Sequence, residues 1–194
     1  MESTEKHKNE KTDRRIRKTK KQLRLALTTL MLEKSINEIT VSQLTALADL
    51  NRSTFYIHYQ DIYDMVEQIE TEIFQQFVEL VQSRTPSAQL LTDIFYFLAE
   101  NADLCAAFLG RHGDYQFVEK FKDVVKQHCL SYWNNQKTQL SPAQMEYFYA
   151  YIASGCIGLI QKWLATGMQE APQQLASMAE TLILQGGQVF FQRP

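Results

Sequence analysis

Residues 40–59 are TVSQLTALADLNRSTFYIHY, and this stretch decides the expected fold of the N-terminal part of the chain. Thr40 precedes apolar residues and has Gln43 three positions later, which is the capping-box pattern of a helix start. Asp49 stands where the chain must turn, because Asp tolerates the left-handed backbone conformation better than most residues. Asn51 is a favourable N-cap for a second helix. The stretch therefore predicts two short helices joined by a tight turn.

Two such helices form a helix-turn-helix, the motif that places its second helix in the major groove of DNA. Its inner face is expected to hold Leu44, Leu47 and Ala48 from the first helix. From the second helix, Phe55 and Tyr59 are expected to face inward because they lie four residues apart. The start of the second helix is then left facing outward. This arrangement predicts a DNA-binding segment.

The outward side chains can be assigned to DNA groups by their chemistry. Arg52 can donate two hydrogen bonds to O6 and N7 of guanine, and an exposed Ile57 suits the methyl group of thymine. Two residues have structural alternatives, Tyr56 as an ordinary aromatic and His58 as a structural histidine. The expected base contacts are Arg52, Ser53, Thr54, Ile57 and His58. The expected phosphate contacts are Thr40, Tyr56, Arg14, Arg17, Lys18 and Lys21.

The N-terminal end is basic in a chain whose formal net charge is -2. Residues 1–24 carry ten Lys or Arg and four Asp or Glu, a balance of +6, whereas residues 25–194 have a balance of -8. This asymmetry favours contact between the basic end and a polyanion. A solvated, disordered tail explains the charge alone equally well, and the adjacent helix-turn-helix pattern favours the polyanion.

Helical periodicity continues through the rest of the chain. No Gly or Pro occurs before Pro86, and the alternating apolar pattern of β-strands is absent. A first helix is expected over residues 13–33. Further helices are expected to start near 86, 142 and 172, and Gly167 is expected to end the helix that begins at Pro142.

This pattern predicts an all-α fold of about nine helices. Residues 1–60 are expected to form the helix-turn-helix DNA-binding domain, with a basic arm over residues 1–13. Residues 61–194 are expected to form a second, entirely helical domain.

The pattern T-V-x-x-L-T-x-x-A-x-L-N-x-S-T-F-Y-x-H-Y, followed by Asp61, Tyr63 and Met65, resembles the DNA-binding domain of the TetR/AcrR family of transcriptional regulators. The resemblance implies that the first three helices bind DNA. It also implies that the remaining helices bind an effector and pair with a second copy through the last two. By this resemblance the base-contacting positions are Arg52, Ser53, Thr54 and His58, and the aromatic that touches phosphate is Tyr56.

Two positions depart from the usual pattern of that family. Asp49 stands in place of Gly, and Ile62 stands in place of a Lys that touches phosphate, which removes one expected backbone contact. The segments 95–101, 110–114 and 151–164 also resemble one branch of the family, some of whose members lie beside dihydroxyacetone-kinase genes. That second resemblance names no ligand.

The last two expected helices, 142–167 and 172–191, are apolar on a broad face. Gly155 and Gly158 allow another helix to approach closely, and each costs about 1 kcal/mol in a helix interior. A symmetric homodimer interface is therefore expected, with an intramolecular core as the alternative. A dimer would read paired half-sites in a near-palindrome. The expected interface residues are Tyr151, Gly155, Gly158, Trp163, Leu182 and Phe190.

A cavity for a small-molecule effector is implied by the resemblance. Aromatic residues between the helices are candidates for its lining, and ordinary core packing is the alternative for each. Because no cluster of carboxylates or histidines accompanies them, neither a metal nor a charged effector is expected. The expected lining residues are Phe95, Phe108, Phe117, Tyr132, Trp133 and Tyr147.

Enzyme, redox and membrane functions find no support in the sequence. It contains no GxSxG, P-loop, GxGxxG or HExxH motif, so neither an enzyme nor a cofactor is expected, and a turn explains His112 and Asp114. Cys105, Cys129 and Cys156 have no CxxC spacing and are expected to be buried thiols. Without an apolar run of 18 residues or a signal peptide, a cytoplasmic protein with no membrane contact is expected.

The expected function is a homodimeric, ligand-responsive repressor that binds a palindromic operator in double-stranded DNA. The alternative is a coactivator of the same fold that acts through a protein partner and does not bind operator DNA itself. Salt-dependent DNA binding separates the two, because phosphate contacts release counterions.

Overall fold

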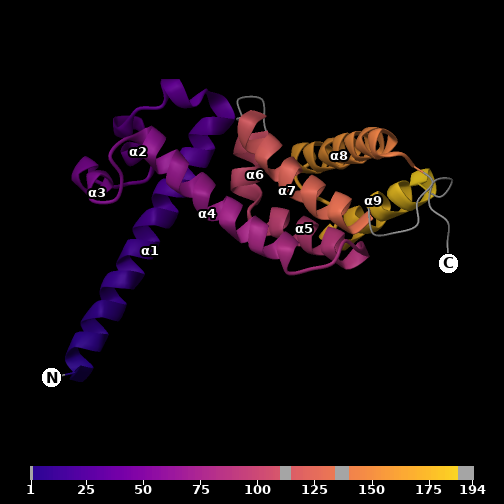
Figure 1. Cartoon of the computed structure of the whole chain (residues 1–194). Helices are drawn as coiled ribbons and strands as arrows, with labels where there is room; N and C mark the ends of the chain where they lie inside the picture. Colours follow the sequence, from indigo (N-terminus) through magenta and orange to yellow (C-terminus); the bar gives the residue numbers. More distant parts are fainter. Residues whose placement is uncertain (1, 110–114, 134–139, 188–194) are drawn as a thin grey trace. The chain divides into compact units, whose positions relative to one another are not determined.

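The structure of the protein is a computed structural model that describes residues 2–109, 115–133 and 140–187, with side chains over 14–108, 116–130 and 140–186. Within these ranges the fold is all-α, as expected, with nine α-helices and one short 3-10 helix, η1 (Ile36–Glu38) (Figure 1). The helices are α1 (Glu2–Glu33), α2 (Val41–Leu47), α3 (Arg52–Tyr56), α4 (Ile62–Gln82), α5 (Ala88–Glu100), α6 (Ala102–Leu109), α7 (Tyr115–Trp133), α8 (Pro142–Ala165) and α9 (Pro172–Gly187).

The chain divides into two compact units within α4. The first unit spans Met1–Ile69, and the second begins at Glu70. The boundary expected after residue 60 is the start of α4. The division by packing falls later, because Met65 and Val66 in the first turns of that helix are buried with the first unit.

In the first unit, α1 packs against α2, and α2 packs against α3. Five side chains drawn from four helices are completely buried, and each contributes roughly 1.5–3 kcal/mol by leaving water. They are Leu23, Leu27, Leu44, Phe55 and Met65.

Two sequence expectations for this unit are corrected. α1 begins at Glu2 rather than at 13, because the preceding residues include no Gly or Pro that would end a helix. The expected basic arm therefore has a helical backbone from Glu2. Leu47 is 51% exposed, because it lies about 100° around α2 from the buried Ala48 and at the edge of the inner face.

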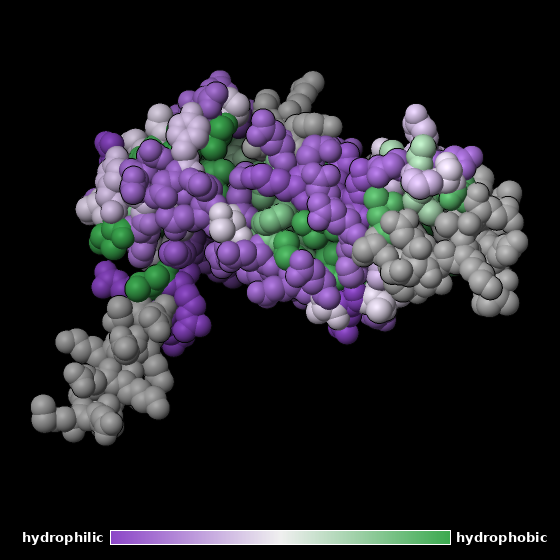
Figure 2. All heavy atoms as spheres, viewed as in Figure 1, coloured by the Kyte–Doolittle hydropathy of each residue, from purple (hydrophilic) through white to green (hydrophobic). Residues whose placement is uncertain are grey.

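In the second unit, α5 packs against α9, α6 packs against α7 and α8, and α8 packs against α9. One core cluster consists of Phe95, Leu98, Trp163, Leu175, Ala176 and Ala179. A second cluster joins Phe77, Val81 and Leu90, and the rings of Phe77 and Phe121 lie 4.6 Å apart within it. Figure 2 shows hydrophobic residues at the surface over part of the second unit, surrounded by hydrophilic ones.

The helix ends of the second unit follow local sequence signals. α8 begins at Pro142 behind the N-cap Ser141, and α9 begins at Pro172, both as expected. α5 begins at Ala88 rather than at 86, because the Ser87 hydroxyl caps it by accepting the N–H of Leu90 at 3.3 Å. Gly167 has φ of 75° directly after α8 ends, as a helix-terminating glycine should.

Candidate nucleic-acid interface and internal cavity

The turn between α2 and α3 is built from two residues that the sequence singled out. Asp49 has φ of 53°, which lets the chain reverse while the N–H of Leu50 donates to the carbonyl of Thr45 at 2.9 Å. Asn51 then caps α3, and its side-chain oxygen accepts the N–H of Ser53 at 3.1 Å. The two expectations are confirmed, and together they fix where α3 starts.

α3 buries one side and presents the other. Phe55 is fully buried and Tyr59 is 5% exposed, as expected of the inward pair. On the outer side Ile57 is 75% exposed, more than any other large apolar residue of the first unit, and Tyr56 is 53% exposed. The exposed apolar side chain of Ile57, at the end of α3, is where the sequence predicts contact with a thymine methyl group.

The remaining expected base contacts lie on the same short segment. Arg52 and Ser53 are exposed, and Thr54 and His58 are half-buried. The Ser53 hydroxyl donates to the side-chain oxygen of Asn51 at 3.1 Å, so it can only accept from a base while it holds the cap. Burial, and after it the charge of Lys20, lowers the pKa of His58 from 6.5, so its imidazole is neutral at pH 7.

The start of α2 has the predicted capping box and carries Thr40, one of the expected phosphate contacts. The Thr40 hydroxyl accepts the N–H of Gln43 at 3.3 Å, and the Gln43 side chain accepts the N–H of Thr40 at 3.2 Å, which completes the predicted capping box. Thr40 is exposed and keeps its hydroxyl proton for an acceptor such as a phosphate oxygen. Lys34 donates to the same Gln43 side chain at 3.1 Å, which brings a cation beside this helix start.

The expected cationic contacts lie on α1. Arg14, Lys18 and Lys21 are exposed and recur at four and three residues, so they share one side of the helix. Arg17 is also exposed. Lys20 is placed differently, because its ammonium lies 5.7 Å from the centre of the Tyr59 ring and packs on the helix-turn-helix itself.

Ile62 stands where the family that the sequence resembles usually has a phosphate-contacting Lys. Its side chain is 5% exposed and forms part of the core of the first unit. The next residue, Tyr63, is 57% exposed, and its hydroxyl donates to the side chain of Asn37 at 2.8 Å. The sequence singles out Tyr63 only as part of the family pattern and predicts no role for Asn37; together their side chains place polar groups on this surface next to the buried Ile62.

The second unit contains a cavity of about 350 Å³ lined by residues of α4 to α9. Three of the aromatics expected to line it, Phe95, Phe108 and Phe117, do so. Tyr147 does not, because it is 79% exposed on the opposite side of α8. The side chains of Tyr132 and Trp133 lie outside the described residues.

The sequence missed the residues that α8 contributes to the cavity. They recur at three- and four-residue intervals, but α8 is apolar on most of its circumference, so this spacing alone does not distinguish the cavity side from the other sides. They are Tyr149, Ile152, Ala153, Cys156, Ile157 and Ile160. Cys105 and Cys129 complete the lining with two further thiols, and burial, with Cys156 nearby, raises the pKa of Cys129 to about 11.

The outer faces of α8 and α9 carry the residues expected at a dimer interface. Tyr151 is 72% exposed and Leu182 is 57% exposed. Gly155 and Gly158 are exposed, and a Cβ built on either would meet no atom within 4 Å. Phe190 lies outside the described residues.

Trp163 was wrongly assigned to that interface. It is 2% exposed, belongs to the core cluster with Phe95, and its indole N–H donates to the carbonyl of Glu170 at 3.0 Å. The described residues contain no group of three His, Cys, Asp or Glu side chains placed to hold a metal ion. Among them, too, no helix is long and apolar enough to span a bilayer.

A sequence profile of the TetR family, described as a transcriptional regulator C-terminal region, matches residues 87–185, which is more than half of the chain. The chain belongs to the TetR family. This family is one of transcriptional regulators rather than enzymes, as expected.

Individual proteins agree with this assignment. The TetR-family chain is 25% identical over 173 residues to YxbF of Bacillus subtilis, an uncharacterised HTH-type transcriptional regulator. The matched region covers 84% of this chain and 44% of YxbF. The chain thus spans less than half the length of that relative.

Two solved structures show the same fold. One is the dihydroxyacetone kinase operon activator DhaS, with 20% identity, a TM-score of 0.55, and coverage of 90% of this chain and 98% of DhaS. The other is the transcriptional regulator FadR from Bacillus subtilis in complex with stearoyl-CoA, with 15% identity, a TM-score of 0.61, and coverage of 85% and 97%.

Proposed function

We propose that this TetR-family regulator is a homodimeric, ligand-responsive repressor that binds a near-palindromic operator in double-stranded DNA. The observation that carries the dimer is the apolar outer face of α8 and α9, where Tyr147, Tyr151 and Leu182 are each more than half exposed. Pairing with a second copy removes this surface from water. A two-fold dimer presents two copies of α3 and so requires two inverted half-sites.

Within each half-site, the exposed segment from Arg52 to His58 supplies the base contacts. Arg52 donates to guanine, Ile57 packs on a thymine methyl group, and Thr54 and His58 add hydrogen bonds. The phosphates are bound by Thr40, Tyr56 and the exposed cations of α1. These contacts make binding strongly dependent on salt.

The cavity of the second unit makes the regulator responsive to a ligand. An occupant that binds more tightly to a DNA-free arrangement of the dimer releases the operator, since a ligand shifts an equilibrium only by its differential affinity. The similar FadR structure holds stearoyl-CoA, a ligand with a long hydrocarbon chain, which supports this fold as one that accepts a small molecule.

Selection of bound fragments from the source genome, followed by footprinting, tests the operator. We expect two inverted half-sites roughly 34 Å apart or a multiple of that distance. Sedimentation of the chain alone should give a dimer at micromolar concentration. A monomer, or a footprint over one isolated half-site, would reject the proposal, and a reporter gene behind the operator would show repression or activation directly.

A coactivator that acts through a protein partner is the second candidate. Ile62 replaces a Lys that usually contacts phosphate in the family, and the similar protein DhaS is described as an activator. Specific DNA binding that weakens steeply between about 50 and 200 mM salt favours the repressor. Absence of such binding favours the coactivator.

A further inference from the structure

The size of the cavity limits its occupant, and the inference that follows rests on the proposed ligand response. The volume of about 350 Å³ is roughly twice that of an engineered apolar cavity of ~150 Å³ that stays dry and binds benzene. An occupant of roughly 10 to 15 non-hydrogen atoms therefore fits.

The lining of the cavity is almost entirely hydrocarbon. Apart from the three thiols, the polar side chains that line it are Ser87, Lys122, Tyr149 and Glu180. Three of these four already have partners within the protein. The Ser87 hydroxyl caps α5, the Tyr149 hydroxyl donates to the carbonyl of Lys122 at 2.6 Å, and the Lys122 ammonium lies 2.6 Å from the Glu119 carboxylate.

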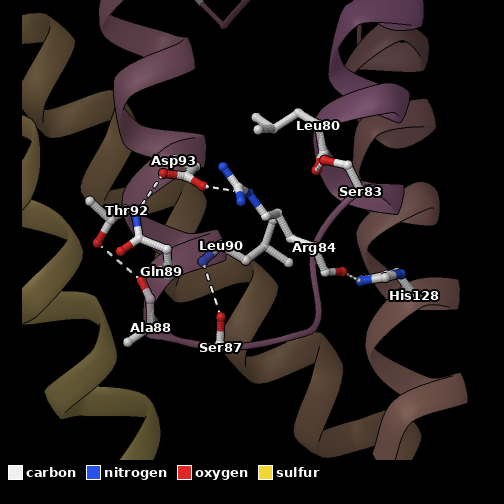
Figure 3. Close-up of polar contacts among 10 residues, drawn as sticks. All are labelled: Leu80, Ser83, Arg84, Ser87, Ala88, Gln89, Leu90, Thr92, Asp93 and His128. Atoms are coloured by element: carbon white, nitrogen blue, oxygen red, sulfur yellow. Dashed lines mark hydrogen bonds and ion pairs between the residues drawn. The ribbon is translucent and has the colours of Figure 1, made fainter.

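Among the described residues, the cations on or beside the cavity already lie in ion pairs with carboxylates. Lys122 is held by Glu119, and the nearby Arg84 at the α4–α5 connection lies 3.1 Å from Asp93, as an ion pair without hydrogen-bond geometry (Figure 3). A carboxylate or phosphate inside the cavity would lose its water without gaining a partner, which costs several kcal/mol.

Glu180 gives the cavity one polar preference. It lines the cavity from α9, is half-buried, and has no hydrogen bond or ion pair to the described residues. A carboxylate accepts hydrogen bonds and repels anions. An ammonium group would donate one hydrogen bond to the Glu180 carboxylate, but its other two N–H groups would lose their water without gaining a partner. A hydroxyl group has only one O–H, which the carboxylate accepts.

We propose that the cavity binds an uncharged, largely hydrocarbon molecule with one hydroxyl group, of the class of medium-chain alcohols. The hydrocarbon chain lies among the apolar side chains of α5, α7 and α8. The hydroxyl donates to Glu180. The carboxylate of the same chain length is rejected, because among the described residues it meets the carboxylate of Glu180 and no unpaired cation.

Titration calorimetry on the full-length, operator-free protein tests this preference with three probes of equal chain length: decan-1-ol, decanoate and decylamine. We expect decanol to bind at least about tenfold more tightly than either charged probe. Equal or tighter binding of decanoate or decylamine overturns the proposal. So does the absence of decanol binding up to its solubility limit.

Substitution of Glu180 gives a sharper test. In Glu180→Gln, the affinity for decanoate should rise by at least about threefold, because the repulsion is gone, while decanol keeps its affinity within about twofold. The matched control, Glu100→Gln, removes an exposed carboxylate that does not line the cavity and should change neither value. An unchanged decanoate affinity in Glu180→Gln overturns the assignment of Glu180.

Two further variants identify the occupied space. Cys156→Phe fills the cavity and should weaken decanol binding by about tenfold or more. If this variant fails to fold, the binding measurements on wild type and Glu180→Gln still test the ligand class. A variant ending at Gly187 tests the chain's own C-terminal residues as occupants. If decanol bound to the truncated variant but not to the full-length chain, the proposal for the full chain would be overturned.

The ligand class and the ligand response can fail separately. If decanol binds but a labelled operator fragment stays bound, the ligand class is supported and decanol-driven release is rejected. If another compound releases the operator and decanol does not bind, the response is supported and the ligand class is overturned.

Discussion

The phenolic hydroxyl of Tyr149 donates a hydrogen bond of 2.6 Å to the backbone carbonyl of Lys122, and this bond joins α8 to α7 beside the cavity. Burial raises the pKa of the same phenol well above 10. Tyr147, two residues earlier on α8, is 79% exposed. The two tyrosines therefore belong to opposite faces of one helix, one facing the cavity and the other the proposed partner.

Tyr149→Phe should lower the free energy of unfolding by about 1 kcal/mol, because one partly buried hydrogen bond is lost and the ring is kept. Tyr147→Phe is the matched control and should stay within about 0.5 kcal/mol of wild type. Urea denaturation of both variants measures the difference, with unchanged m-values as the sign that the folded state is intact. Equal stabilities would mean that the bond to Lys122 contributes nothing.

The protein should lose stability in alkali through Cys129. Burial, and after it Cys156, raises the pKa of its thiol from 9.0 to about 11. Between these values the unfolded chain holds fewer protons than the folded one, so the free energy of unfolding falls as the pH rises. The contribution is complete below pH 9 and is lost as the pH rises through 11.

Denaturation at pH 8 and pH 10.5 measures this loss of stability. The decrease between the two pH values should be smaller in Cys129→Ala than in wild type. Tyr149 and Cys156 also have raised pKa values, so the variant should keep part of the decrease. An identical decrease in both proteins would contradict the burial of the Cys129 thiol.

Arg52→Ala should weaken specific DNA binding by about 1–3 kcal/mol and relax the preference at a single base position. Because Arg52 is exposed, the free energy of unfolding should change by less than about 0.5 kcal/mol. Gel-shift titrations against single-base variants of the operator measure the first effect. Arg14→Ala is the comparison, and it should weaken binding to all sequences and reduce the salt slope by about 1.

Gly158→Ala distinguishes an effect on the dimer interface from an effect on the stability of the single chain. Helix propensity alone would stabilise α8 by up to about 1 kcal/mol, and a Cβ at this position meets no atom of its own chain within 4 Å. If a partner helix packs closely here, the added methyl group should instead weaken the dimer. Sedimentation equilibrium of the variant measures the dimer affinity, and a dimer as tight as wild type would move the interface away from Gly158.

The sequence determined the local features of the protein. The caps at Thr40 and Asn51, the left-handed Asp49, the start of α8 near residue 142 and its end at Gly167 were all predicted and are confirmed. Each depends on hydrogen bonds or backbone conformation within four or five residues. The inward and outward sides of α3 were predictable for the same reason, because that helix has one apolar side.

Only the tertiary structure decided how the apolar residues of α8 are divided between a core, a cavity and an exposed face. Tyr147, Tyr149, Tyr151 and Trp163 are equally good candidates for each in the sequence, because α8 is apolar on most of its circumference. Which neighbour covers which side depends on the packing of α5, α7 and α9 from distant parts of the chain. That packing buries Trp163, places Tyr149 beside the cavity and leaves the other two tyrosines in water.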